Sequence, residues 1–342
     1  MTIEIKELAE SDAERWDELV LASEQGTFFH LSSWRSVIET AFGHRTYYLC
    51  AFRSERLVGV LPLAHTRSML FGRALVSLPF GVYGGPVVAD AEAFDPLANA
   101  AAELAQRLKV DYLELRSRES VLPDWPTKSL YVTFRKAIDR DPEVNLQAVP
   151  RKQRAMIRKG IQEGLTSDTE TTIDDFFRMY SLSVRNLGTP VFPARYFRCL
   201  KDTFGDKCEI LTIRKDGRPV ASVMSFFFRD EVLPYYGGGD TEARDTKAND
   251  FMYWELMRRS CEKGIRVFDF GRSKIDTGSY RFKKHWGFEP QPLSYRYHLV
   301  NAKTVPDLNP LNPKYRLLIS AWKRLPLPIS QWCGPKIARF LG

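Results

Sequence analysis

The sequence predicts an α/β protein that contains two similar domains. The same order of elements occurs twice along the 342 residues, which is the main observation behind this prediction. A chain of this length also exceeds a typical single hydrophobic core. Hydrophobic residues make up 44% and charged residues 27% of the chain, as in ordinary globular proteins.

Each half reads as strand, polar turn, strand, aromatic residues entering glycines, helix and short strand. The order is common enough to recur by chance, but the similar spacing in both copies favours a duplication. We therefore predict domains at residues 1–140 and 141–300, followed by a tail at 301–342. The matched segments are 47–64 with 208–228, 82–90 with 235–243, 96–108 with 249–263, and 111–117 with 266–273.

This order outlines the centre of a GNAT acyltransferase fold. In that fold one strand splays from its neighbour, and the opening exposes backbone N–H groups. The helix that follows points its positive end at an anionic acyl carrier. We expect two tandem GNAT-like domains with mixed central sheets flanked by helices, and an active cleft built mainly by the second.

Several other classes of protein are disfavoured. The charged start, MTIEIKEL, does not suit a secretory signal, and no apolar run approaches the ~20 residues of a membrane span. The five cysteines form no CxxC pair and are expected to be reduced thiols of a cytoplasmic protein. The histidines lie far apart in the sequence, so we expect no metal site.

The net charge of +8 is concentrated in two places, the tail and the segment 151–159. Arg151, Arg154 and Arg158 follow helical spacing and share one face, with Lys152 beside them. Such a row suits a pyrophosphate or a nucleic-acid backbone. A solvated helix face is the alternative, but residues 151–162 contain no acid that could pair with the row.

The segment 268–297 carries the most chemistry. Tyr280, Arg281, Phe282, Lys283 and Lys284 bring aromatic and cationic side chains together after a turn-rich loop. This combination suits a planar group that carries phosphate. A basic loop whose aromatic residues belong to the core is the alternative.

The stretch GSYRFKKHWGFEP resembles the signature near the C-terminus of FemA/FemB/FemX aminoacyltransferases. The similarity extends to FFHLSSW, PRKQRAMIRKG and YYGGGD, and so touches most of the chain. The continuation WGFEPQPLSYRY and the WKRLPLP tail look more like the FemAB branch associated with exosortase and exopolysaccharide loci. These families are tandem GNAT-like proteins, and the peptidoglycan enzymes move an amino acid from aminoacyl-tRNA onto a precursor peptide. The long helical arm that some members use for tRNA contact has no counterpart here.

The resemblance implies that Phe282 and Lys283 lie beside the reacting ester. A lysine there would stabilise the oxyanion and the departing oxygen. Arg272 and Lys274 would meet phosphates or a carboxylate. Tyr236 and Tyr280 would hydrogen-bond the substrate or pack against their own strands. We group Gly237, Arg281 and Lys284 with these substrate-binding candidates.

No motif of a covalent acyl-enzyme is present, so direct attack by an amine is expected. An α-amine is partly neutral near pH 8, which makes a strong base dispensable. Asp240 is the first candidate for a base, with Asp250, Asp269 and Asp276 as rivals. Capping of a turn is the alternative role for Asp240.

The predicted function is therefore N-acyl transfer onto an amine of a cell-envelope or exopolysaccharide precursor. The donor would be aminoacyl-tRNA or acyl-CoA, bound as a substrate, with no permanent cofactor. One alternative is a CoA-dependent N-acetyltransferase with backbone donors at 237–247. Another is a non-catalytic protein that binds RNA or an anionic membrane.

The tail contains two apolar stripes with basic flanks, at 315–325 and 329–340. Basic amphipathic helices of this kind suit an anionic membrane surface. Docking of both helices onto the protein's own core is equally compatible. A lipid-linked acceptor would place the protein at the inner face of the cytoplasmic membrane.

Overall fold

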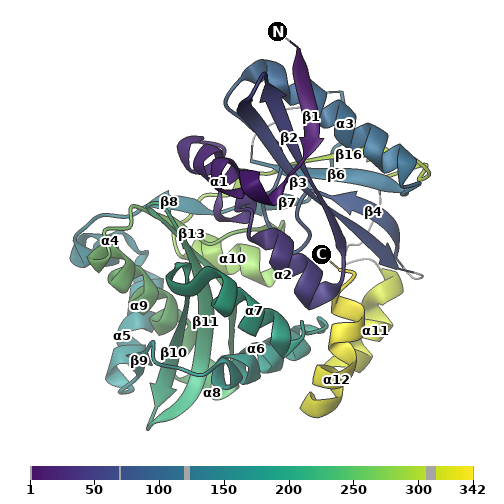
Figure 1. Cartoon of the computed structure of the whole chain (residues 1–342). Helices are drawn as coiled ribbons and strands as arrows, with labels where there is room; N and C mark the ends of the chain where they lie inside the picture. The colour runs from purple at the N-terminus through teal and green to yellow at the C-terminus, as the bar shows by residue number, and fades with distance from the viewer. Residues whose placement is uncertain (1, 69–70, 119–123, 306–312, 342) are drawn as a thin grey trace. The chain divides into compact units, whose positions relative to one another are not determined.

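The computed structural model describes residues 2–68, 71–118, 124–305 and 313–341 (Figure 1). The chain divides into two compact α/β units, as the fold class predicted from sequence requires. Unit 1 comprises Met1–Tyr131, Pro292–Asp307 and Arg339–Gly342, and unit 2 comprises Val132–Gln291 and Leu308–Ala338. Residues 292–300, which we assigned to the second domain, thus belong to unit 1, and most of the tail belongs to unit 2.

Unit 1 is built on a sheet of order β1-β2-β3-β4-β6-β16, with β5 paired to β3. Only β4 and β6 run parallel among these described pairs. Helix α3 packs its alanines and leucines on the apolar face of this sheet. The elements are β1 (Ile3–Glu7), α1 (Ala13–Ala22), α2 (Trp34–Phe42), β2 (Arg45–Arg53), β3 (Arg56–Ser68), β4 (Gly72–Val76), β5 (Val87–Val88), α3 (Phe94–Arg107), β6 (Tyr112–Ser117) and β16 (Ser294–Leu299).

Unit 2 is built on a sheet of order β8-β13-β12-β11-β10-β9. A small sheet of order β14-β7-β15 is formed by β14 (Ser273–Lys274), β7 (Tyr131–Thr133) and β15 (Gln291–Pro292). The main strands are β8 (Arg135–Ala137), β9 (Thr166–Asp168), β10 (Cys208–Lys215), β11 (Arg218–Phe228), β12 (Glu231–Gly239) and β13 (Val267–Asp269). The helices are α4 (Pro142–Ala148), α5 (Arg151–Gln162), α6 (Ile173–Leu187), α7 (Ala194–Phe204), α8 (Glu242–Asp245), α9 (Ala248–Glu262), α10 (Gly278–His285), α11 (Pro313–Lys323) and α12 (Leu327–Ala338).

The predicted repeat is visible in the topology of the two sheets. The order β1-β2-β3-β4-β6 in unit 1 matches β9-β10-β11-β12-β13 in unit 2, and α3 matches α9. Each sheet is completed by a strand from the other half of the chain: β16 pairs with β6, and β8 pairs with β13. In Figure 1 the yellow-green β16 therefore lies beside the blue β6, and the teal β8 joins the green sheet.

The two copies differ at their glycines. In unit 2, β12 runs through Tyr235 and Tyr236 into Gly237–Gly239 as one strand. In unit 1 the corresponding strand is broken, because β4 ends at Val76 and the short β5 begins only at Val87.

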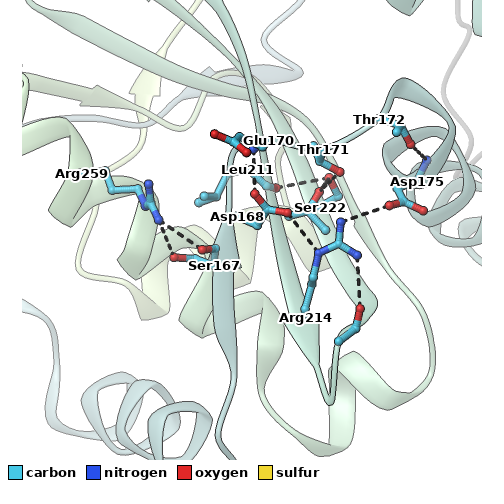
Figure 2. Close-up of polar contacts among 12 residues, drawn as sticks. Ser167, Asp168, Glu170, Thr171, Thr172, Asp175, Leu211, Arg214, Ser222 and Arg259 are labelled. Carbon is cyan, nitrogen blue, oxygen red and sulfur yellow. Dashed lines mark hydrogen bonds and ion pairs between the residues drawn. The ribbon is translucent and has the colours of Figure 1, made fainter.

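The edge of the second sheet is tied to α6 by ion pairs. Arg214 on β10 contacts Asp168 on β9 and Asp175 on α6, each at 3.2 Å (Figure 2). Thr172 caps α6, because its hydroxyl accepts a hydrogen bond from the backbone N–H of Asp175 at 3.1 Å. The contacts fix α6 across the strands that it covers.

The tail helices α11 and α12 lie against α6 within unit 2. Ile319 packs against Gly188, and Gly334 against Val191. Leu317 and Leu318 remain exposed, as does Trp332. The helices of the described residues include none with the length and hydrophobicity that a membrane crossing requires.

Successive glycines let helices approach both faces of β12. A Cβ atom on Gly237 would lie 3.1 Å from the hydroxyl oxygen of Tyr253 on α9. A Cβ atom on Gly238 would lie 2.7 Å from the carbonyl oxygen of Met179 on α6. The glycine run is thus required by close packing of α6 against the strand.

Replacing Gly238 by alanine should destabilise unit 2, since the new methyl group meets the α6 backbone and not a flexible side chain. Overpacking of this kind costs about 1–3 kcal/mol. Gly278→Ala is the matched control, because a Cβ at Gly278 meets nothing within 4 Å. Urea unfolding of the two variants measures the difference, and equal stabilities would contradict this account.

Candidate functional site

The central feature of unit 2 is an opening in its sheet. Strands β12 and β13 run parallel, but only Glu231 and Val232 have register partners, Val267 and Phe268. Beyond Val232, the edge of β12 has no strand partner among the described residues. A bulge opposite Met224 and Ser225 adds a residue, Tyr235, at the point where the strands part. Backbone groups of the glycine end are therefore available on this edge.

The loop after the glycines uses many of its own backbone N–H groups. The Asp240 carboxylate accepts a hydrogen bond from the N–H of Ala243 at 3.0 Å. The N–H of Arg244 donates to Thr241 and that of Thr246 to Glu242, so these groups close the turn of α8. Asp240 therefore has the capping contact that we considered as its alternative role.

The Phe-Lys-Lys triplet lies on helix α10. The Thr277 hydroxyl caps this helix by accepting from the N–H of Tyr280 at 3.4 Å. Phe282 is half-buried, and its ring centre lies 5.5 Å from that of Tyr253 and 6.2 Å from that of Trp286. Lys284 is exposed, whereas Lys283 points into the protein and is buried.

Lys283 holds the chain that follows β13. Its ammonium nitrogen donates to the carbonyl oxygens of Gly271 at 2.9 Å and Arg272 at 3.1 Å. It also lies 5.6 Å from the centre of the Phe134 ring. Burial lowers the pKa of Lys283 to about 7, against an opposing effect of Asp269 and with a further lowering by Arg272. Two N–H groups of Lys283 thus donate to backbone carbonyl oxygens. With a pKa of about 7, the amine can gain or lose its third hydrogen near neutral pH.

Asp269 organises the same region from β13. Its carboxylate accepts hydrogen bonds from the N–H of Gly271 at 2.7 Å and the hydroxyl of Thr133 at 3.1 Å. Arg135 on β8 forms an ion pair with it at 3.3 Å. These contacts of Asp269 fix the turn that Lys283 contacts. Because the Asp269 side chain is fully buried, its carboxylate is not accessible as a general base.

A second buried carboxylate joins three helices. Asp250 on α9 accepts hydrogen bonds from Gln153 on α5 at 2.6 Å and from the indole N–H of Trp286 at 3.1 Å. Burial raises the pKa of Asp250, and these two hydrogen bonds oppose the rise. The network anchors the end of α10, and with it the position of Lys283. Of the proposed rivals to Asp240, then, Asp250 and Asp269 have structural partners, and Asp276 lies exposed before α10.

The basic row predicted at the junction is a helix, α5. Arg151, Lys152 and Arg158 are exposed, and Arg154 is half-buried and donates to Gln147. The opposite face packs on α9, where Gly160 meets Phe251. Since Gln153 binds Asp250, the start of the row is anchored to the same carboxylate as α10.

The structure does not bring Tyr236 to the opening. Its hydroxyl lies 2.8 Å from that of Tyr196, and its ring packs among Tyr180, Phe192 and Phe197. Burial raises the pKa of Tyr236 well above its ordinary value. This side chain belongs to an aromatic cluster under α6 and α7. Its surroundings therefore fit the alternative role given above, which was packing and not a hydrogen bond to the substrate.

Tyr253 lies at the opening, and the sequence reasoning missed it. Its hydroxyl oxygen is close to the backbone of Gly237, and its ring contacts Phe282 and Phe270. Burial raises its pKa to about 12, with a smaller contribution from Asp250, so the hydroxyl remains a donor. The sequence feature that could have identified Tyr253 is its position on the helix that follows the glycine strand.

The remaining candidates surround α10. The Tyr280 ring packs on Phe134 at 5.5 Å, and Arg281 donates to the Asp276 carbonyl at 3.0 Å. Arg272 and Lys274 are half-buried and take part in interactions within the protein. The part of the chain that the structure describes holds no group of three or more His, Cys, Asp or Glu side chains suited to a metal ion.

Replacing Lys283 by methionine should change the pH dependence of stability. Between pH 7 and 10.5 the unfolded chain keeps the lysine proton and the folded chain releases it, so unfolding takes up a proton and stability rises with pH. Below pH 7 the cost of the buried charge is fully present. The stability of the natural protein relative to Lys283→Met should therefore grow from pH 7 to 9, by at most about 1.4 kcal/mol per pH unit.

Urea unfolding at pH 7, 8 and 9 measures this difference. Lys284→Met serves as the control, since that side chain is exposed and should show no such trend. A constant difference for Lys283→Met across this range would mean that the lysine keeps its proton in the folded protein.

Comparison with known proteins gives a consistent result for the fold. A family model described as an acetyltransferase (GNAT) domain matches residues 151–284. The structure of FemX is similar with a TM-score of 0.69 and 16% identity, over 92% of this chain and 100% of that one. A tandem GNAT protein from the clavulanic acid biosynthesis pathway is similar with a TM-score of 0.54 and 14% identity, over 90% of this chain and 100% of that one.

A third similar structure is the C-terminal domain of a protein from Agrobacterium fabrum described as a lysylphosphatidylglycerol synthetase. It gives a TM-score of 0.55 and 14% identity, over 85% of this chain and 92% of that one. The search of curated proteins finds no match to the sequence. Residues 151–284 thus match the GNAT acetyltransferase domain family, and the chain has a fold similar to those of FemX and of the tandem GNAT protein.

Proposed function

We propose that the protein transfers an aminoacyl group from an activated ester to an amine, at the opening between β12 and β13. The observation that carries this proposal is the meeting of three features within unit 2. These are the glycine end of β12, whose edge toward β13 has no strand partner among the described residues, the hydroxyl of Tyr253 beside Gly237, and the Phe282–Lys283 pair on α10. The similarity to FemX supports an aminoacyl donor, and the acceptor is an amine of a cell-envelope or exopolysaccharide precursor.

In this reaction the amine nitrogen attacks the ester carbonyl, and the bond to the donor oxygen then breaks. The oxygen that departs needs a proton, and the attacking nitrogen must lose one. Lys283 suits both transfers, because a group with pKa near 7 gives up and regains a proton at little cost. Tyr253 and the glycine N–H groups would stabilise the charge on the carbonyl oxygen.

The loop chemistry favours an ester donor over acyl-CoA. A CoA pyrophosphate would need free backbone donors between Gly237 and Lys247, but several of those N–H groups close the α8 turn. The loop also carries three acids, Asp240, Glu242 and Asp245, against two cations, Arg244 and Lys247, so its charge gives little attraction for phosphates. The exposed row on α5 offers cations for an RNA backbone instead.

Replacing Lys283 by methionine should reduce transfer by about 10²–10⁴-fold, the contribution typical of a general acid or base. The assay incubates the protein with tRNAs charged with labelled amino acids and a cell-envelope extract, and measures label in products other than tRNA. Lys284→Met should retain activity, because its side chain is exposed and lies outside the proposed chemistry. A parallel arm supplies labelled acetyl-CoA.

Transfer from acetyl-CoA alone would favour the CoA-dependent alternative. Undiminished transfer by Lys283→Met would remove this lysine from the chemistry. Because the same variant leaves two backbone carbonyls without a donor, its folding should be checked by circular dichroism before the rates are compared.

We also propose that the tail contacts a membrane surface, which would bring the enzyme to a lipid-linked acceptor. Leu317 is 84%, Leu318 67% and Trp332 69% exposed, and the Lys336 ammonium lies 3.8 Å from the Trp332 ring centre. Exposed apolar residues with nearby cations suit anionic lipid. Leu318→Gln/Trp332→Gln should weaken flotation with phosphatidylglycerol vesicles, and unchanged flotation would contradict this role.

A further inference from the structure

Unit 1 contains a cationic pocket that the acyl-transfer proposal does not use. The pocket has a volume of about 530 Å³, within the usual range for small-molecule sites. Arg45, Arg67, Arg73, Arg107, Arg339 and His65 line it. No Asp or Glu is present among its described lining residues.

The sheet builds this pocket by a change of residue type along each strand. On the face covered by α3, alternate positions are apolar: Tyr47 on β2, Leu63 on β3 and Leu75 on β4. Two residues further toward one end of the sheet, the same rows continue as Arg45, His65 and Arg73. Arg67 extends the β3 row, and Arg107 ends α3. Separate elements therefore each place a cation at the same end of the apolar core.

The strand register sets like charges opposite one another. Arg67 on β3 is the direct partner of Arg73 on β4, so two guanidinium groups occupy opposed positions. Like charges in directly opposed positions destabilise a sheet. A fold without a use for these cations would gain from replacing either member of the pair.

The other end of β3 shows how the same conflict is resolved when no ligand is needed. There Arg56 is opposite Arg53, but Arg53 forms ion pairs with Asp90 and Glu92. In the pocket, by contrast, none of the five arginines forms an ion pair with a described residue. Asp111 accepts a hydrogen bond at 2.8 Å from the backbone N–H of Arg73, and it does not line the pocket.

The pocket also holds a buried polar atom without a partner. The Nε2 atom of His65 is inaccessible to solvent and forms no hydrogen bond. Burial lowers the pKa of His65, and Arg67 and Arg73 lower it further, followed by His44 and Arg45. The charges of Arg67 and Arg73 therefore act on this imidazole.

The C-terminal segment closes the pocket and is held firmly. His44 donates from Nε2 to the carbonyl oxygen of Arg339 at 2.7 Å. The Arg339 guanidinium donates to the carbonyl of Phe42 at 2.6 Å. Both contacts lie within unit 1, so Arg339 is a fixed part of the lining.

We propose that this pocket binds a ligand that carries two or more phosphate groups. A single phosphate supplies a charge of about −1.5 to −2 at neutral pH, which is too little to balance five arginines that form no ion pair with a described residue. Guanidinium groups bind phosphate oxygens in bidentate pairs, and the concave shape suits a compact diphosphate. The same chemistry exists in free diphosphates and in phosphorylated lipid headgroups. The proposal does not depend on acyl transfer in unit 2.

The test measures binding of inorganic pyrophosphate to the full chain by calorimetry at low ionic strength. Arg67→Gln/Arg73→Gln should lower the affinity at least tenfold. Arg56→Gln/Lys303→Gln removes two exposed cations of unit 1 away from the pocket and should leave the affinity unchanged. Because the first variant relieves a like-charge pair, its thermal midpoint without ligand should not fall, which separates lost binding from lost folding.

Vesicles distinguish the two sources of phosphate. Binding to vesicles that contain a polyprenyl diphosphate lipid, if pyrophosphate displaces it and Arg67→Gln/Arg73→Gln abolishes it, identifies a lipid headgroup. Pyrophosphate binding without such vesicle binding identifies a soluble diphosphate. The proposal is overturned if pyrophosphate does not bind the natural protein. Equal affinity of both double variants for pyrophosphate would overturn it as well.

Discussion

The parting of β12 from β13 after two register pairs is the constraint on which the second unit depends. A parallel pair that continued would consume the backbone groups of the glycine end, and no substrate could meet them. The separation is kept open by elements on both faces of β12. Gly238 lets α6 lie directly on the strand, and Gly237 admits Tyr253 from α9. On the other side of the opening, Lys283 and Asp269 fix the turn that follows β13.

The buried charges of this region are a cost to folding that local packing alone does not require. An apolar side chain at the position of Lys283 would avoid the desolvation that lowers its pKa to about 7. Asp269 offsets part of this cost and is itself stabilised by Thr133 and Arg135. Such an arrangement is common where a proton must move near neutral pH, and perturbed groups gather at functional sites for that reason. Together with its place on a helix anchored through Trp286, this lowered pKa supports the proposed role of Lys283 in proton transfer.

Much of this architecture could be predicted from sequence because its signals are local. The hairpins, the two helices and the order of the repeat all follow from patterns within about 30 residues, such as the Asp216–Gly217 turn. The exchange of β8 and β16 between the sheets could not be predicted, because an edge strand chooses its partner across the whole chain. The role of Tyr236 stayed open for the related reason that two tyrosines in a row alternate faces, and only the packing of α7 shows which is buried.

The cationic pocket of unit 1 illustrates the same limit. Its arginines come from three strands and a helix, with the C-terminal segment added, so no window of sequence contains the pattern. The basic row on α5 was visible for the opposite reason, since helical spacing places it within nine residues. The two surfaces also differ physically. An exposed row along a helix suits an extended polyanion, whereas opposed cations around a concave site suit a compact one. The register of β3 against β4 places the exposed Arg67 and Arg73 in opposed positions, and a bound polyphosphate would offset the repulsion between them.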